Sequence, residues 1–155
     1  MELSSEVKEA PLAVKAALRE GVKGVEHALI ESGGLQGEES YTLPGAGLFH
    51  SFGDGIYVRE CHFAKGTLLS TKIHRFAHPF FLMKGKLQIL SEDGPIELEA
   101  PHYGITPAGT KRAVYALEDL VWITVHPTKS KDLADIESEI IAEDFSEFPL
   151  NERIG

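Results

Sequence analysis

The sequence predicts a mainly β protein, a small barrel with an amphipathic helix before it and a short helix after it. Short runs rich in β-branched and aromatic residues alternate with turn signals from about Leu48 to His126, as in small all-β barrels and sandwiches. Apolar residues recur at helical spacing only near the two ends of the chain. No long helical pattern interrupts the β-rich runs, so a parallel α/β sheet is not expected.

Residues 1–34 are expected to form a helical extension. Pro11 suits the first turn of a helix, and the pair Gly33-Gly34 is expected to end it. One apolar face lies between them: Val14, Leu18, Val22, Val25 and Leu29. We expect this face to pack on the outside of the barrel or against a partner subunit. The next segment, 35–47, is Gly-rich and polar and is interpreted as a loop.

Residues 48–127 are expected to form the barrel. Its strands should end at turn signals such as Lys84-Gly85 and the segment Glu92–Pro95. The expected strands are Ile56–Phe63, Thr67–His74, Phe80–Lys84, Lys86–Ser91, Ile96–Ala100, Tyr103–Thr106, Lys111–Leu117 and Leu120–His126.

Residues 130–155 are expected to form an acidic tail with a short helix. Leu133, Ile136 and Ile140 have helical spacing, and Asp132 and Asp135 fall in the first turn, where the helix dipole favours acids. Most of the net charge of −9 comes from this tail, which is interpreted as a solvated surface.

Composition and charge exclude several classes of protein. At 155 residues with 43% apolar content, the chain fits one globular domain with its own core. Because basic residues are not clustered, nucleic-acid binding is not expected. No apolar run is long enough for a membrane-spanning helix. The first residues lack a signal-peptide pattern and Cys61 is the one cysteine, so we expect a cytoplasmic protein without disulfides.

Two glycine-framed segments carry most of the candidate chemistry, GTLLSTKIHRFAHPFFLMKG (66–85) and PAGTKRAV (107–114). Together they resemble the two half-motifs of the cupin superfamily, in which three histidines and a glutamate bind a divalent metal. The resemblance covers about half of the chain. It implies a cupin-type double-stranded β-helix barrel.

The resemblance also assigns four residues to the metal-ligand positions. His74 matches the second histidine of the first motif, and His78 stands where the family has its glutamate. Lys72 matches the first histidine and Arg112 the last. A divalent ion such as Fe, Mn, Ni or Zn would then be held by His74 and His78.

A third protein ligand is needed, because catalytic metals usually have three. The candidates are His62, Glu60 and His126. The alternative is that the histidines are hydrogen-bonded barrel residues without a metal, since a lysine and an arginine nearby would repel a cation.

The two basic substitutions suggest an anionic ligand. If Lys72 and Arg112 face the lumen, as the family positions imply, their charges need partners there. One partner would be an internal acid such as Glu60, and another would be a bound carboxylate or phosphate, which arginine holds through two hydrogen bonds. Small-molecule sites are also largely apolar, so Trp122 and Tyr103 complete the predicted ligand-binding set.

Three classes of function remain open at this point. The first is a cupin that binds a small molecule, with or without a metal. The second is a metal-dependent enzyme, such as an isomerase, dioxygenase or lyase. The third is a structural protein, because PAGTKRAVYALEDLVWITVHPT (107–128) resembles phage and prophage cupins of unassigned activity. Cupins are commonly dimers, so the resemblance also implies a homodimer or a higher homo-oligomer.

Overall fold

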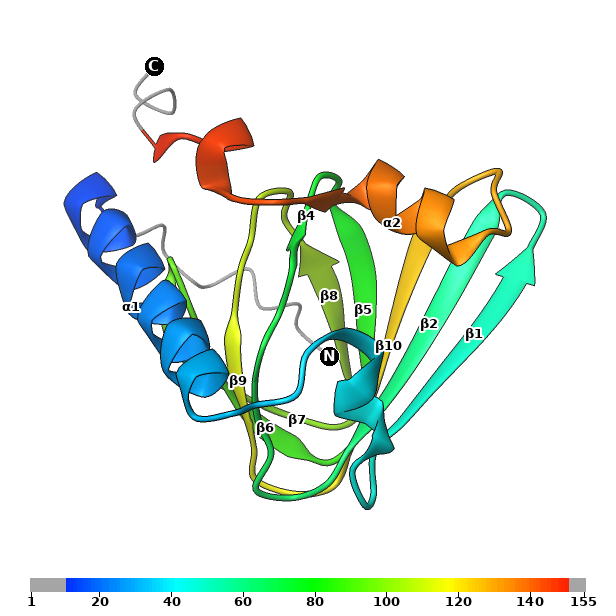
Figure 1. The fold of residues 1–155 in the computed structure, drawn as a ribbon, viewed down its shortest axis with the longest axis horizontal. Coiled ribbons are helices and arrows are strands. Elements are labelled where there is room, and N and C mark those ends of the chain that lie inside the picture. Colours follow the sequence, from blue (N-terminus) through cyan, green and yellow to red (C-terminus); the bar gives the residue numbers. More distant parts are fainter. Residues whose placement is uncertain (1–10, 151–155) are drawn as a thin grey trace.

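Two antiparallel sheets face each other and form the barrel (Figure 1). The structure is a computed structural model that describes residues 11–150. One sheet has the order β1-β2-β10-β5-β8, the other has the order β3-β9-β6-β7, and a short pair joins β11 to β4. The strands are β1 (Gly47–Gly53), β2 (Ile56–Phe63), β3 (Leu68–Ser70), β4 (Ile73–His74), β5 (His78–Lys84), β6 (Lys86–Ser91), β7 (Gly94–Glu99), β8 (His102–Thr106), β9 (Ala113–Ala116), β10 (Leu120–Pro127) and β11 (Ile141–Ala142).

The five-stranded sheet turns alternate side chains into the barrel, because successive residues of a strand point to opposite faces. Thr124 of β10 lies between Arg59 of β2 and Phe80 of β5, so these three residues form one inward-facing row. His126 and His78 are each two residues from that row, in the same direction along the sheet. Both histidines therefore face inward at the same end of the barrel.

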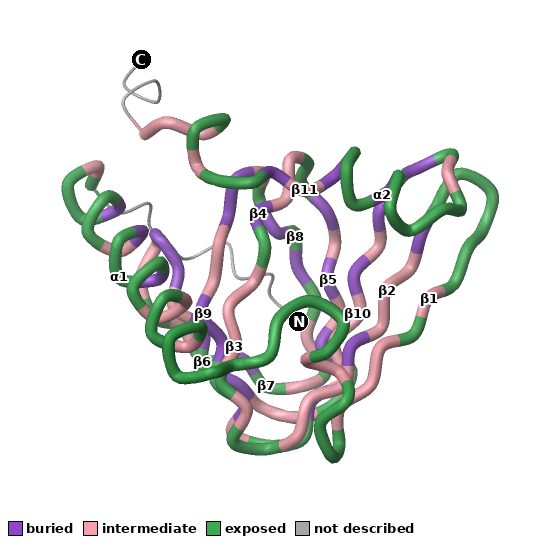
Figure 2. Tube along the Cα trace, in the orientation of Figure 1, coloured by how far each residue is buried: buried purple, intermediate pink, exposed green. Residues whose placement is uncertain are grey.

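The apolar core fills the other end of the barrel, around the turn that joins β5 to β6. Its largest fully buried members are Leu82, Leu87 and Ile89. Figure 2 shows buried residues along β5 and β10, whereas the segment 32–46 before the barrel is mostly exposed. Gly85 forms the turn with a φ of 93°, and a Cβ there would lie 2.2 Å from the Asp119 carbonyl oxygen. Glycine is required at this position for both reasons.

The N-terminal helix α1 (Leu12–Glu31) lies beside the four-stranded sheet (Figure 1). The predicted apolar face is correct at Val22, which is fully buried, but wrong at Val14, which is 46% exposed. Lys15 and Arg19 are buried instead, and they form ion pairs with Asp93 and Glu92 in the turn between β6 and β7. The apolar periodicity does not predict this contact, because ion pairs attach this part of the helix to the four-stranded sheet.

Most predicted strands differ from the observed ones by one or two residues at an end, and three differences are larger. The strand expected over Thr67–His74 is divided into β3 and β4, and the strand β1 lies before the first predicted strand. Although β1 contains two glycines, its residues pair along their whole length with β2. Ile141 and Ala142, expected to continue a helix, form β11 and pair with His74 and Ile73.

The C-terminal segment covers the histidine end of the barrel (Figure 1). Helix α2 (Leu133–Ile140) begins after Asp132, whose side chain accepts a hydrogen bond from the Asp135 backbone N–H at 3.0 Å. Ile136 and Ile140 are buried against Tyr57. The described part of the acidic tail is therefore docked through its apolar side, while its acidic side chains, such as Asp135 and Glu143, are exposed as expected of a solvated surface.

Two short 3₁₀ helices, Gly37–Thr42 and Phe145–Glu147, complete the described elements. None of the helices in residues 11–150 is long and apolar enough to cross a membrane.

Candidate functional site

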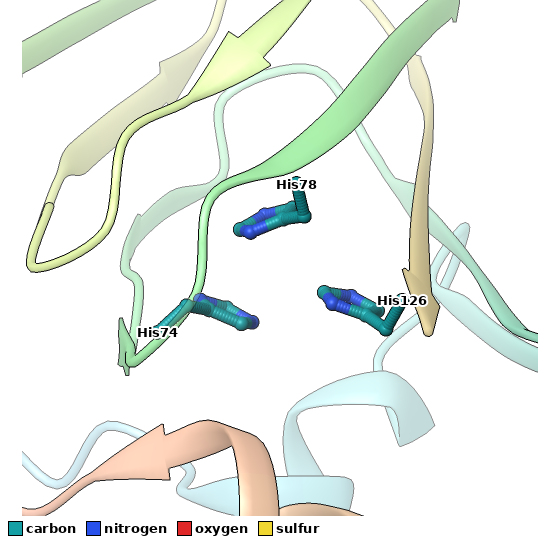
Figure 3. Close-up of side chains that lie close together, drawn as sticks. All are labelled: His74, His78 and His126. Atoms are coloured by element: carbon teal, nitrogen blue, oxygen red, sulfur yellow. The ribbon is translucent and has the colours of Figure 1, made fainter. Parts of the chain in front are cut away.

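Three histidines lie close together inside the barrel, at the end that the C-terminal segment covers (Figure 3). His74 comes from β4, His78 from the start of β5 and His126 from the end of β10. One ligand nitrogen from each lies within 4.8 Å of the others. The ring centroids are 4.4 Å apart for His74 and His78, 4.6 Å for His78 and His126, and 5.2 Å for His74 and His126. Of the predicted third ligands, His126 is the one that joins the pair.

Hydrogen bonds behind the cluster orient its rings. The Nδ1–H group of His78 donates to the Phe76 carbonyl oxygen at 3.1 Å, because a carbonyl can only accept. This bond leaves the Nε2 lone pair of His78 available for a ligand. His126 Nε2 lies 2.9 Å from Thr124 Oγ1, and the His74 ring bonds to the backbone of Lys72. Second partners of this kind fix the rings of metal-binding histidines in other proteins.

Burial lowers the pKa of all three imidazoles and keeps His74 and His126 neutral at pH 7. Burial, together with repulsion from Arg59 and from the protonated forms of His78 and His126, lowers the pKa of His74 to about 3. Burial, His78 and Arg59 likewise lower the pKa of His126 to about 4. The pKa of His78 is lowered by burial, against the hydrogen bond to Phe76, and by the charge of Arg112. The rings of His74 and His126 therefore each carry one nitrogen lone pair at neutral pH.

Acid is expected to destabilise the metal-free protein as the pH falls below about 6.5. In the unfolded chain a histidine takes up a proton near pH 6.5, whereas His74 and His126 remain neutral in the folded protein until pH about 3 and about 4. The unfolded state therefore binds more protons in this window, and each histidine should remove roughly 2 kcal/mol of stability at pH 5. Urea unfolding at pH 7.5 and pH 5.0 measures this difference.

A double variant, His74→Asn with His126→Asn, isolates the contribution of the cluster from that of other groups. It should lose most of the wild-type pH dependence, whereas His27→Asn, which changes an exposed histidine on α1, should keep it. An unchanged pH dependence in the double variant would contradict the assignment.

Arg112 lies beside the cluster on an aromatic platform. Its Nη1 group donates to Thr106 Oγ1 at 3.1 Å, and its guanidinium carbon lies 5.5 Å from the centre of the Phe80 ring. Trp122 stacks against the same Phe80 ring. The two ring centres are 4.5 Å apart and the rings are nearly parallel. Burial lowers the pKa of Arg112 to about 10, so the side chain is charged at pH 7.

Four other predicted site residues lie away from this cluster. The Lys72 side chain is half exposed and forms an ion pair with Glu137 of α2, so it does not extend into the lumen. Tyr103 lies on the outer face of β8, where it is 40% exposed and stacks with Phe81. Glu60 and His62 occupy the outer face of β2 and bond to each other at 2.7 Å. Strand alternation turns them outward, because Arg59 and Cys61 face inward.

The inner face of β2 adds residues that were not predicted. The Tyr57 hydroxyl bonds to His50 Nδ1 at 2.7 Å, and its ring lies 5.9 Å from that of His126. Arg59 lies next to Tyr57 on the same face. The alternation of Tyr57, Arg59 and Cys61 is visible in the sequence, but it does not tell which face of the strand points inward.

A separate open groove of about 570 Å³ lies between α1 and the outer side of the four-stranded sheet. Its lining is mainly apolar and includes Val25, Ile89, Ile96 and Tyr115. None of the three clustered histidines lines this groove, so it does not belong to the candidate site.

No protein-family profile matches the sequence, and no curated protein matches it. Among solved structures, a salicylate 1,2-dioxygenase mutant from Pseudoaminobacter salicylatoxidans has a TM-score of 0.50 and 13% identity, and covers 77% of this chain and 34% of the dioxygenase. KdgF from Halomonas sp. has a TM-score of 0.49 and 17% identity, covering 59% of this chain and 86% of its own. A cupin superfamily protein from Desulfitobacterium hafniense has a TM-score of 0.47 and 14% identity, covering 54% and 77%.

At these identities the comparisons bear on the fold alone. The resemblance to phage cupins is not among their findings and stays a prediction. The sheet order, the helix before the barrel and the match to the dioxygenase structure agree with the fold expected from the two glycine-framed segments. The described chain has the cupin fold.

Proposed function

We propose that this protein binds a divalent transition metal through His74, His78 and His126 and a small anionic ligand at Arg112 beside the metal. The observation that carries the proposal is the cluster of three imidazoles from three different strands, each with a lowered pKa. Neutral nitrogen donors are the form that binds metals, and imidazole suits Fe, Ni, Cu and Zn.

The donor set fits such an ion. Two nitrogens bound to one ion at about 2.0–2.1 Å each lie at most about 4.2 Å apart, and the three nitrogens of the cluster already lie within 4.8 Å of one another. The cluster contains no carboxylate, which favours Fe, Ni or Zn over the Mn that was also expected. Three protein ligands leave at least one position open, as in catalytic sites. This open position favours a metal-dependent enzyme as the second candidate, with the anionic ligand as its substrate.

Metal analysis of the purified protein and calorimetric titration of metal-free protein with Fe²⁺, Ni²⁺ and Zn²⁺ test the proposal. We expect close to one ion per chain and a higher melting temperature with the ion, because the ion binds the folded state. Failure of all three ions to bind or to raise the melting temperature would overturn the proposal.

We further propose that the protein is a homo-oligomer whose contact is the outer face of the five-stranded sheet. Apolar side chains gather there, including Phe49, Met83 and Ile105, which are 53%, 59% and 60% exposed. Such a face is typical of a subunit interface. Ile105→Glu should shift the mass measured by light scattering towards the monomer, whereas Val14→Glu on α1 should not. A wild-type protein that is monomeric at all concentrations tested would contradict this.

A further inference from the structure

A second arginine, Arg59, lies inside the barrel in addition to Arg112. It projects from β2 in the inward-facing row that contains Thr124 and Phe80. Its Nη2 group donates to the Tyr41 hydroxyl at 2.9 Å, and its Nε group donates to Cys61 Sγ at 3.4 Å. Neither acceptor is a carboxylate, so these bonds pair Arg59 with no acidic side chain.

Neither inward arginine forms an ion pair with a carboxylate among residues 11–150. The same chain does pair other buried cations, as Arg19 with Glu92 shows. Glu60, the neighbour of Arg59 in the sequence, is on the outer face and bonds to His62. A divalent ion at the histidines would add two more positive charges to this end of the barrel. The charge of Asp93 acts favourably on Arg112, but Asp93 forms its ion pair with Lys15. Buried charge without an ion-paired carboxylate is costly, so we infer that an anion is the partner of this site.

The two arginines flank the two strands that carry His126 and His78. Arg59 is on β2, and Arg112 bonds to Thr106 on β8, with β10 and β5 between them. Three strand spacings separate β2 from β8, about 14 Å along the sheet. His126 and His78 lie on the two middle strands. The charge of Arg59 lowers the pKa values of His74 and His126, and that of Arg112 lowers the pKa of His78.

We propose that the ligand of this barrel is a small dicarboxylate, with one carboxylate on Arg112, the other on Arg59, and its chain across the histidine cluster. This inference rests on the proposed function, because it names the ligand class of the same site. Guanidinium groups bind carboxylates through paired, charge-assisted hydrogen bonds, so two separated arginines select two separated carboxylates.

Arg59 also has a structural contact that the test must separate from ligand binding. Its guanidinium carbon lies 5.5 Å from the centre of the Tyr41 ring, which belongs to the 3₁₀ helix Gly37–Thr42 before the barrel. If Arg59 only attaches this helix to β2, Arg59→Gln should lower stability without changing ligand selectivity. Tyr41→Phe removes the hydroxyl partner of Arg59 and keeps its charge, so it should lower stability and retain selectivity.

Calorimetry on zinc-loaded and metal-free protein provides the test. The probes are malonate, succinate, glutarate and adipate, with acetate and butyrate as monocarboxylates and inorganic phosphate as a compact dianion. One dicarboxylate length should bind about tenfold tighter than the monocarboxylates or more, in keeping with one additional charged hydrogen-bonding partner. Arg59→Gln and Arg112→Gln should each remove this preference and leave zinc content unchanged. Lys84→Gln removes an exposed charge at the other end of β5 and is the matched control.

Dicarboxylates that bind no tighter than monocarboxylates or phosphate, or a preference that survives Arg59→Gln, would overturn the inference. If Arg59→Gln does not fold, Arg59→Lys decides in its place, because it retains the charge but loses the paired hydrogen bonds. Its dicarboxylate preference should fall several-fold, and an unchanged preference would count against the inference. Zinc binding without dicarboxylate preference refutes this inference alone. A dicarboxylate preference that needs both arginines in a protein that binds no metal refutes the metal proposal alone.

Discussion

His126→Ala is expected to weaken zinc binding by about 100-fold or more, since even second partners of metal ligands contribute 10–100-fold. His126 supplies one of three nitrogens within 4.8 Å of one another, and no carboxylate in that cluster can replace it. Competition titration with a chromogenic chelator measures the change. Because His126 lies near the end of β10 and the apolar core surrounds the other end of the barrel, the variant should keep its fold.

His62→Ala is the matched control for this experiment. From the sequence, His62 and His126 are equal candidates for the third ligand, but His62 lies on the outer face of β2 and bonds to Glu60 at 2.7 Å. Its removal should leave zinc affinity unchanged. Equal losses in the two variants, or a larger loss in His62→Ala, would mean that the cluster in the structure is not the metal site.

Leu82→Ala is expected to lower the free energy of unfolding by about 2–5 kcal/mol, the range for large apolar residues cut back to alanine in a core. Leu82 is fully buried in the middle of β5, within the cluster that includes Phe80 and Leu87. The cavity would open among strands from both sheets, so neither sheet alone can close it. Urea unfolding at neutral pH measures the loss.

Met83→Ala provides the comparison, because Met83 is the next residue of the same strand and is 59% exposed. Strand alternation turns it outward, so its truncation should cost less than about 1 kcal/mol. A similar loss in both variants would contradict the inward and outward assignment of β5, on which the positions of His78 and Phe80 also depend.

Much of the barrel could be predicted from local patterns. β2 and β6 have the predicted boundaries, because runs of alternating apolar residues between clear turn signals leave little choice of limits. β1 was missed because its glycines and polar residues resemble a loop, and its strand conformation depends on pairing with β2. β11 depends in the same way on β4. Both strands are stabilised by partners far away in the sequence, which a local pattern does not contain.

The candidate site was predictable only in part. His74 and His78 occupy positions given by the resemblance, and their spacing brings them to the same end of the barrel. His126 was one of several equal candidates, since the choice between it and His62 depends on which face of each strand points inward. The position of Lys72 was wrong for the same reason. Lys72 pairs with Glu137, which is 65 residues later in the sequence, and this pairing depends on where helix α2 docks.

The sequence by itself therefore determined a small barrel with a helix on each side, and the resemblance to the cupin motifs placed two histidines in it. The barrel and its helices follow from residue periodicity and turn residues, which act over short distances along the chain. Only the tertiary structure decided that His126 completes the cluster, that Arg59 faces inward in addition to Arg112, and that the C-terminal segment covers this end. These features depend on strand register and on the docking of distant segments, so they arise only when the two sheets close around a common interior.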